Sequence, residues 1–142
     1  MSLAMSKVDR EKFLADLHVG VVSMNRVDAG PLSAPIWYIY ENDLIWFTTG
    51  AQSRKGKLMQ VGDRISMVVQ TESAPYQYVS VEGPIVAREA VDLERDVRPM
   101  AIRYLGDKQG NGYADASSTS GSVLVKMKPE KWLTVDYSLM NA

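Results

Sequence analysis

One ten-residue segment of the chain gathers side chains that could bind an anion. It runs from Thr48 to Lys57 and reads Thr-Thr-Gly-Ala-Gln-Ser-Arg-Lys-Gly-Lys, between the end of a predicted strand and the start of a predicted helix. Helix N-termini favour acidic residues because the helix dipole is positive there, so the cations Arg54 and Lys55 predict an anion in front of them. The Thr48 and Ser53 hydroxyls and free main-chain N–H groups would donate to a phosphate. A solvated cationic surface is the alternative, and spacing alone does not decide between the two.

Aromatic side chains are concentrated on the two predicted strands before this segment. They are Trp37, Tyr38, Tyr40, Trp46 and Phe47. In a barrel about half of them point outward, and a large apolar patch on a monomer is rarely left uncovered. We therefore expect a partner subunit or a planar ligand to cover the outward ones. The alternative is that all five belong to the core or to a dimer interface.

The composition excludes several kinds of chemistry. The chain has no cysteine and a single histidine, His18, which excludes thiol catalysis and thiolate metal sites and argues against a His-based metal site or a Ser-His-Asp triad. No metal is expected. Difficult chemistry would then come from a bound organic cofactor. A net charge of -1 gives no basic excess for nucleic acid. Without an apolar span or signal sequence the protein is expected to be cytoplasmic, with no membrane partner.

The length of 142 residues indicates one domain. Residues 1–5 are expected to be a tag or disordered start, which leaves 6–142 as the domain. Strands are predicted at 19–25, 33–40, 44–49, 64–71, 76–89, 122–128 and 132–137, and helices at 6–18, 53–61 and 91–105. Pro99 should break or kink the last helix, residues 106–121 should form a loop, and Gly83-Pro84 should form a bulge or bend. The pattern predicts a mainly β fold, a small antiparallel β-barrel with peripheral helices, with a β-sandwich as the alternative.

Three short motifs resemble the pyridoxamine 5'-phosphate oxidase superfamily, whose fold is the FMN-binding split β-barrel. They are Phe47-Thr48, Ser53-Arg54-Lys55-Gly56 and Val81-Glu82-Gly83. The resemblance covers about residues 33–89. Residues 33–38, 103–106 and the last two strands are similar to a branch of flavin and deazaflavin oxidoreductases that use FMN or coenzyme F420. The Arg-x-His that vitamin B6 oxidases carry near the C-terminus is missing, so that activity is not expected.

The resemblance implies a set of cofactor-binding residues. They are Ser33, Pro35, Trp37, Phe47, Thr48, Thr49, Ser53, Arg54, Lys55, Lys57 and Tyr78. It also implies a homodimer with the cofactor between the subunits, where Arg103, Trp132 and Tyr137 would contact the partner's cofactor. Lys57 adds a third cation, which favours the longer anion of coenzyme F420 over FMN.

The expected function is hydride transfer between this cofactor and a small organic substrate. No side chain is an obvious acid–base catalyst, and Tyr78, Tyr104 and Tyr137 are unranked candidates for a proton donor. Two alternatives are a non-catalytic flavin- or haem-binding protein and a ligand-free structural dimer.

Overall fold

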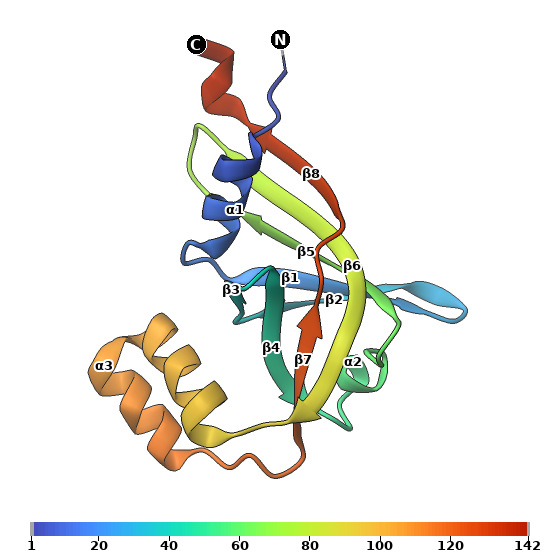
Figure 1. The fold of residues 1–142 in the computed structure, drawn as a ribbon, viewed down its shortest axis with the longest axis vertical. Coiled ribbons are helices and arrows are strands. Elements are labelled where there is room, and N and C mark those ends of the chain that lie inside the picture. Colours follow the sequence, from blue (N-terminus) through green and yellow to red (C-terminus); the bar gives the residue numbers. More distant parts are fainter. Residues whose placement is uncertain (1, 142) are drawn as a thin grey trace.

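Eight strands and five helical segments make up the computed structural model, which describes residues 2–141 (Figure 1). The strands are β1 (Gly20–Arg26), β2 (Ala29–Ile36), β3 (Ile39–Glu41), β4 (Leu44–Gly50), β5 (Arg64–Gln70), β6 (Gln77–Ala90), β7 (Ser122–Met127) and β8 (Lys131–Asp136). The helices are α1 (Lys7–Ala15), α2 (Arg54–Lys57), the π-helix η1 (Leu93–Val97), α3 (Arg98–Ala116) and the 3₁₀-helix η2 (Tyr137–Asn141). None of the helices in the described part is long and apolar enough to cross a membrane.

The strands pair antiparallel in the order β2-β1-β5-β6-β7-β4-β3, and β8 pairs with β6. The long strand β6 runs through the whole molecule and belongs to both halves of the barrel (Figure 1). Its first part pairs with β5 and β8, and its last part pairs with β7. The last two strands therefore follow one another along β6 and do not pair with each other.

Alternation along the strands builds the core inside the barrel. The inward positions hold Val22 and Met24 of β1, Ile65, Met67 and Val69 of β5, Val79, Val81 and Ile85 of β6, and Val125 and Met127 of β7, all buried. Helix α1 closes one end of the barrel with Phe13 and Leu14. The edge strands β2 and β3 are joined by two residues, Trp37 and Tyr38. The predicted antiparallel barrel with peripheral helices is confirmed.

The predicted strand 33–40 is in fact two strands. The break at Trp37 and Tyr38 turns the chain from one half of the barrel to the other. Tyr38 enters the core, where its hydroxyl donates to the main-chain oxygen of Leu14 at 2.5 Å. The hairpin predicted at Glu41–Leu44 is confirmed, and Asn42 and Asp43 both have positive φ, as a type I′ turn requires.

The helix after β6 is longer than predicted. It extends to Ala116, and Gly106, at φ +83°, folds it into two arms (Figure 1). A Cβ at Gly110 would lie 2.5 Å from the Cα of Ile102, so glycine there lets the arms touch. Pro99 lies in the first turn of α3 and does not break it, because the first helical turn needs no N–H donor. The prediction of a loop over residues 106–121 is therefore wrong for residues 106–116, which belong to α3.

The predicted bulge at Gly83-Pro84 is also misplaced. The register of β6 against β7 shifts between Ile85 and Ala87. Gly83 serves another purpose, because a Cβ there would lie 1.7 Å from the main-chain oxygen of Lys128. This close approach lets the link between β7 and β8 cross over β6.

The two short helical regions bury only part of their apolar side chains. Phe13 and Leu14 of α1 are buried, whereas Val8 and Leu17 are exposed. After α2, Met59 is fully buried and Val61 is exposed. At the start of the chain, the main-chain oxygen of Leu3 accepts a hydrogen bond from Asp136 of β8. The origin of residues 1–5 as a tag stays a prediction.

Candidate functional site

The segment that was predicted to bind an anion forms a compact loop between β4 and β5. Its helix α2 has only four residues, so a helix dipole contributes little and any anion must be attracted by side chains. The Ser53 hydroxyl donates to the Gly50 oxygen at 2.7 Å and accepts from the Gly56 N–H at 3.1 Å. The prediction that this hydroxyl donates to a phosphate is therefore wrong, since its proton is used within the loop.

Gly56 allows the loop to close on itself. A Cβ at this position would lie 2.0 Å from the main-chain oxygen of Gly50. Every other residue type carries a Cβ, so any substitution here must displace the backbone. The glycine in the Ser-Arg-Lys-Gly motif is thus explained by a close contact between two backbone segments.

The cations of the loop have no acidic partner among residues 2–141. Arg54 and Lys57 are exposed, Lys55 is half-buried, and no carboxylate lies within 4.0 Å of their charged groups. The main-chain N–H groups of Gln52, Arg54 and Lys55 also find no acceptor within the described chain. Three cations and three free N–H donors in one short loop form a donor set that fits a phosphate.

The two threonines at the end of β4 point in opposite directions. Thr48 lines a cavity of about 100 Å³ between β4 and α3, together with Trp37, Tyr113 and three serines. These serines are Ser117, Ser118 and Ser122. Thr49 points inward, and its Oγ1 is buried without a hydrogen-bond partner in the described structure. The side chain of Phe47 lies entirely in the core, so this residue has only its main chain to offer a ligand.

The outward aromatics are covered by the chain itself. Trp46 packs with Met100 of α3 and is almost fully buried. Trp37 stacks on Tyr104 of α3, with ring centroids 5.0 Å apart and ring planes 5° apart. The expectation that a partner subunit or planar ligand covers these rings is therefore wrong for the faces that α3 occupies.

Sequence reasoning missed Arg88 of β6, whose guanidinium donates hydrogen bonds to main-chain oxygens of the loop. Its Nη1 donates to the main-chain oxygens of Gly56 at 2.7 Å and Met59 at 2.8 Å, and its Nη2 donates to that of Ala51 at 3.4 Å. The only signal in the sequence was a lone arginine in a strand otherwise rich in apolar residues. Nothing in that pattern indicates a partner 29 to 37 positions away.

Comparison with known families gives one match that spans most of the chain. Residues 9–136 match the family described as pyridoxamine 5'-phosphate oxidase. The chain belongs to this family. The family predicted from the motifs and its split β-barrel are thereby confirmed. No curated protein sequence matches the chain.

Solved structures share the fold of this family member at low sequence identity. The conserved hypothetical protein Rv2991 from Mycobacterium tuberculosis has a TM-score of 0.79 and 20% identity, over 99% of this chain and 90% of that one. An F420 reductase has a TM-score of 0.63 and 19% identity, over 87% and 94%. A FAD-binding protein from Mesorhizobium loti has a TM-score of 0.67 and 16% identity, over 92% and 94%.

Three residues that the family resemblance assigned to the cofactor lie away from the loop on the outer face of the β2-β1-β5-β6-β8 sheet. Ser33 is exposed, and its hydroxyl lies 2.7 Å from that of Ser23 across the strand pair. Pro35 of β2 lies opposite Val21 of β1. Tyr78 of β6 lies opposite Gln70 of β5 on one side and Val135 of β8 on the other. The structure therefore brings Trp37 and Thr48 together beside α3, places residues 53–57 in the loop after β4, and leaves Ser33, Pro35 and Tyr78 on this sheet.

The residues expected to reach a partner subunit make contacts within the chain. Arg103 donates to the main-chain oxygens of Ala15 and Asp16, at 3.1 and 2.8 Å, and so caps α1. The Trp132 ring lies under the Arg10 guanidinium, 4.4 Å away. Tyr137 is 42% exposed and is the one of these three that is most open to a second molecule.

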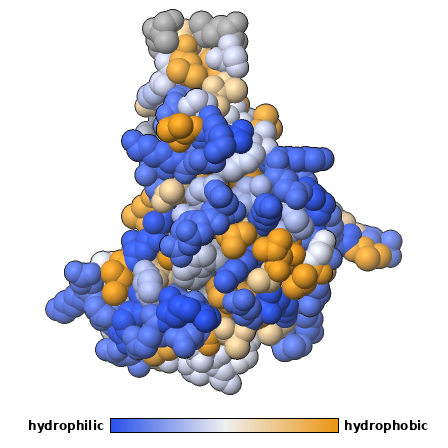
Figure 2. Space-filling model, in the orientation of Figure 1, coloured by the Kyte–Doolittle hydropathy of each residue, from blue (hydrophilic) through white to orange (hydrophobic). Residues whose placement is uncertain are grey.

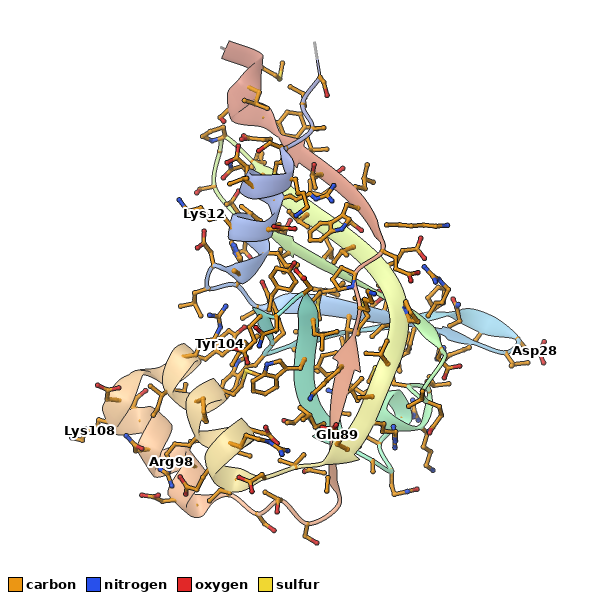
Figure 3. All side chains as sticks on the ribbon, viewed as in Figure 1. Lys12, Asp28, Glu89, Arg98, Tyr104 and Lys108 are labelled. Atoms are coloured by element: carbon orange, nitrogen blue, oxygen red, sulfur yellow. The ribbon has the colours of Figure 1, made fainter. Side chains whose placement is uncertain are left out.

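The structure also ranks the candidate proton donors. The Tyr104 hydroxyl lies 2.6 Å from the His18 oxygen and 3.0 Å from the Tyr38 oxygen, so its proton is committed to the main chain (Figure 3). Tyr78 and Tyr137 remain as candidates. His18 stacks on Phe13, and burial lowers its pKa below the usual value. No group of three or more potential metal ligands occurs in the described part of the chain.

Proposed function

We propose that this family member is an oxidoreductase that binds FMN or coenzyme F420, with the cofactor's phosphate on the loop between β4 and β5. The observation that carries the proposal is the donor set of this loop. Arg54 and Lys55 have no carboxylate partner in the described structure, and the N–H groups beside them have no acceptor. A phosphate would supply both.

The names of the structural neighbours agree with this class of cofactor. They include an F420 reductase and FAD-binding proteins. When bound, the isoalloxazine or deazaflavin ring supplies hydride transfer to or from a small organic substrate. The chain's own part is to hold the phosphate through Arg54 and Lys55, to orient the ring, and to exclude water.

A second subunit completes the proposed site. The cavity beside Thr48, at about 100 Å³, is far smaller than the roughly 300–1,000 Å³ of sites that enclose a small molecule. The outer face of the β2-β1-β5-β6-β8 sheet carries small and apolar side chains as well as the charged Arg64, Glu82 and Lys131. The small and apolar ones include Ser23, Ser66, Val68, Ser80 and Leu133, which is 61% exposed. We therefore place the homodimer interface on this face, where a hollow of about 400 Å³ reaches Trp132.

The deazaflavin is the preferred cofactor in this proposal. Lys57 is exposed on α2 and has no acidic partner within the described residues. It lines a groove that continues to Arg64 and Asn25 and that also contains the carboxylate of Asp63. The phosphodiester and glutamate tail of coenzyme F420 form a longer anion than FMN, and such an anion could use this extra cation.

A binding protein without turnover is the second candidate. It is favoured by one neighbour, a FAD and heme binding protein from Mycobacterium smegmatis with a TM-score of 0.66 and 13% identity. Haem needs an axial ligand, and the single histidine of the chain, His18, has a buried Nε2 that packs beside Phe13. This geometry favours flavin or deazaflavin over haem.

A binding titration tests the proposal. FMN and coenzyme F420 are each added to the purified protein, and the affinity is measured by fluorescence at low and high salt. We expect micromolar or tighter binding of at least one, with tighter binding of F420 that weakens as salt screens the tail. Lys57→Ala should remove part of that salt dependence. Tight FMN binding without F420 binding would reverse the cofactor preference, and binding of neither would refute the proposed function.

A turnover assay separates the two candidates. The protein loaded with reduced cofactor is mixed with small electrophilic acceptors, such as quinones and nitroaromatic compounds, and the cofactor absorbance is followed. Reoxidation that accelerates with acceptor concentration supports an oxidoreductase. A cofactor that stays reduced with every acceptor supports the binding protein.

A further inference from the structure

We propose that Arg88 is the positioning residue of the phosphate site. It holds the carbonyl side of the 51–59 loop, so that the N–H groups and cations of that loop face a bound anion. This inference rests on the proposed function, because it assumes that a cofactor phosphate binds at Arg54 and Lys55. It goes beyond that function by assigning the shape of the site to a residue that does not touch the ligand.

The strand register explains how Arg88 reaches the loop. Arg88 of β6 lies opposite Val125 of β7. Residues directly opposite each other in an antiparallel pair project to the same face, and Val125 is fully buried in the barrel. The Arg88 side chain therefore starts on the inner face and is half-buried. Its guanidinium ends against the loop, where it donates to three main-chain oxygens.

These hydrogen bonds orient the peptide groups of the loop. In a trans peptide the C=O and N–H groups point in opposite directions. The oxygen of Ala51 faces Arg88, so the N–H of the next residue, Gln52, points away from Arg88. That N–H is one of the donors without an acceptor in residues 2–141. Turning this peptide around would present an oxygen to the anion and repel it.

The oxygens at the end of α2 give the same argument. The Gly56 and Met59 oxygens are directed to Nη1 of Arg88 at 2.7 and 2.8 Å. Main-chain carbonyl oxygens are hydrogen-bond acceptors with partial negative charge, which an incoming phosphate would avoid. No carboxylate of the described chain lies within ion-pair distance of Arg88, so its guanidinium is fully available to them.

The geometry requires arginine at this position. The planar guanidinium presents five donors in a fixed fork and can bond several acceptors at once, whereas a lysine ammonium is a compact point charge on a flexible stem. Arg88→Lys would keep the positive charge but would lose the simultaneous bonds to Ala51, Gly56 and Met59. This difference separates positioning from simple charge attraction.

The test compares ligands that differ only in the anion. Dissociation constants of FMN and riboflavin are measured for the wild type, Arg88→Met and Arg88→Lys. The same is done for coenzyme F420 and the deazaflavin riboside that lacks its phosphodiester tail. For the anionic ligand that the wild type prefers, we expect both variants to lose about tenfold or more in affinity, the scale of a charge-assisted hydrogen bond. Affinity for the uncharged ligand should change by less than about twofold.

Arg26→Met is the matched control. Arg26 also donates to a main-chain oxygen, that of Gly30 at 2.8 Å, but in the hairpin between β1 and β2. It should leave the ratio of anionic to uncharged ligand affinity unchanged. Thermal unfolding of each variant checks the fold, and Arg88→Lys keeps the test open if Arg88→Met does not fold.

The outcomes separate the two proposals. A wild type that prefers neither anionic ligand over its uncharged counterpart overturns the phosphate site and this inference with it. If the wild type shows that preference and the Arg88→Lys variant keeps it, only the positioning role of Arg88 is overturned. Equal losses for the anionic and uncharged ligands would also overturn it, because they would indicate general loosening of the barrel.

Discussion

The hydroxyl group of Tyr104 donates a 2.6 Å hydrogen bond to the main-chain oxygen of His18, 86 positions earlier in the chain. The same hydroxyl accepts a bond from the main-chain N–H of Tyr38 at 3.1 Å. One side chain of α3 thus joins three separate segments, the helix, the link before β1 and the break between β2 and β3 (Figure 3). Tyr104 is therefore a structural residue of the site and not its proton donor.

Removing this hydroxyl should destabilise the protein. Tyr104→Phe leaves the partly buried main-chain groups of His18 and Tyr38 without this partner, which costs roughly 1–3 kcal/mol. The free energy of unfolding in urea measures this loss. Tyr113→Phe is the control, because Tyr113 lies on the same helix, is 50% exposed and has no hydroxyl hydrogen bond among the described residues. Equal stability of the two variants would show that the Tyr104 bonds carry no net energy.

The loop cations should determine cofactor affinity with little effect on stability. Arg54→Ala and Lys55→Ala should each weaken FMN or F420 binding by roughly 1.5–3 kcal/mol, the scale of a charge-assisted hydrogen bond. Lys12→Ala removes an exposed cation of α1 and serves as the control (Figure 3). Calorimetric titration gives the affinities. If both loop variants bind as the wild type does, the phosphate is bound elsewhere.

Gly56 should tolerate no side chain. Gly56→Ala places a Cβ 2.0 Å from the Gly50 oxygen, so the loop must move and we expect cofactor affinity to fall at least tenfold, about 1.4 kcal/mol. Gly112→Ala has no atom within 4 Å of the added Cβ and lies in α3. That control should keep its affinity and gain up to about 1 kcal/mol of stability from helix propensity. An unchanged affinity in Gly56→Ala would mean that the loop does not shape the site.

The single histidine should make the protein less stable below neutral pH. Burial lowers the pKa of His18, the nearby Arg103 charge lowers it further, and Asp16 opposes the shift. The unfolded chain, with a pKa of about 6.5 at this residue, then takes up a proton more readily than the folded one. Stability should therefore fall as the pH drops below about 6.5, until the folded pKa is passed. Urea unfolding at pH 7.5, 6.5 and 5.5 measures this fall.

His18→Gln tests the assignment. This variant cannot titrate, so its stability should change less over the same pH range than that of the wild type. The chain has no other histidine, so the difference between the two proteins belongs to His18. Parallel pH curves for wild type and variant would contradict the assignment.

A single charged substitution on the proposed dimer face should prevent dimerisation. Leu133 of β8 is 61% exposed on the outer face of the sheet, so Leu133→Arg should leave the monomer fold intact and bury a charge in the dimer. Light scattering should show twice the 15.8 kDa of one chain for the wild type and 15.8 kDa for the variant.

Val8→Arg is the control for this prediction. Val8 lies on α1 and is 73% exposed, away from that sheet face. Apolar residues are scattered over the surface seen in Figure 2, so exposure alone does not mark an interface. A monomeric wild type would refute the dimer, and a dimeric Leu133→Arg variant would place its interface on another surface.

The barrel itself was predictable because its signals are local. Apolar and β-branched residues on 44–49 and 64–71 gave strands close to β4 and β5, and the Asn42-Asp43 turn gave the hairpin between β3 and β4. The Ser-Arg-Lys-Gly motif gave the loop and its cations. In these segments, near neighbours in sequence decide the backbone conformation.

The tertiary structure decided everything that depends on distant contacts. Gly106 and Gly110 look like helix breakers in the sequence, yet they let α3 fold back on itself and cover Trp37 and Trp46. The proton of the Ser53 hydroxyl is used by Gly50, and the loop is held by Arg88 from a strand 32 positions beyond Gly56. Such contacts depend on which backbone groups the folded barrel brings together, because a donor's partner is set by position in space and not by spacing along the chain.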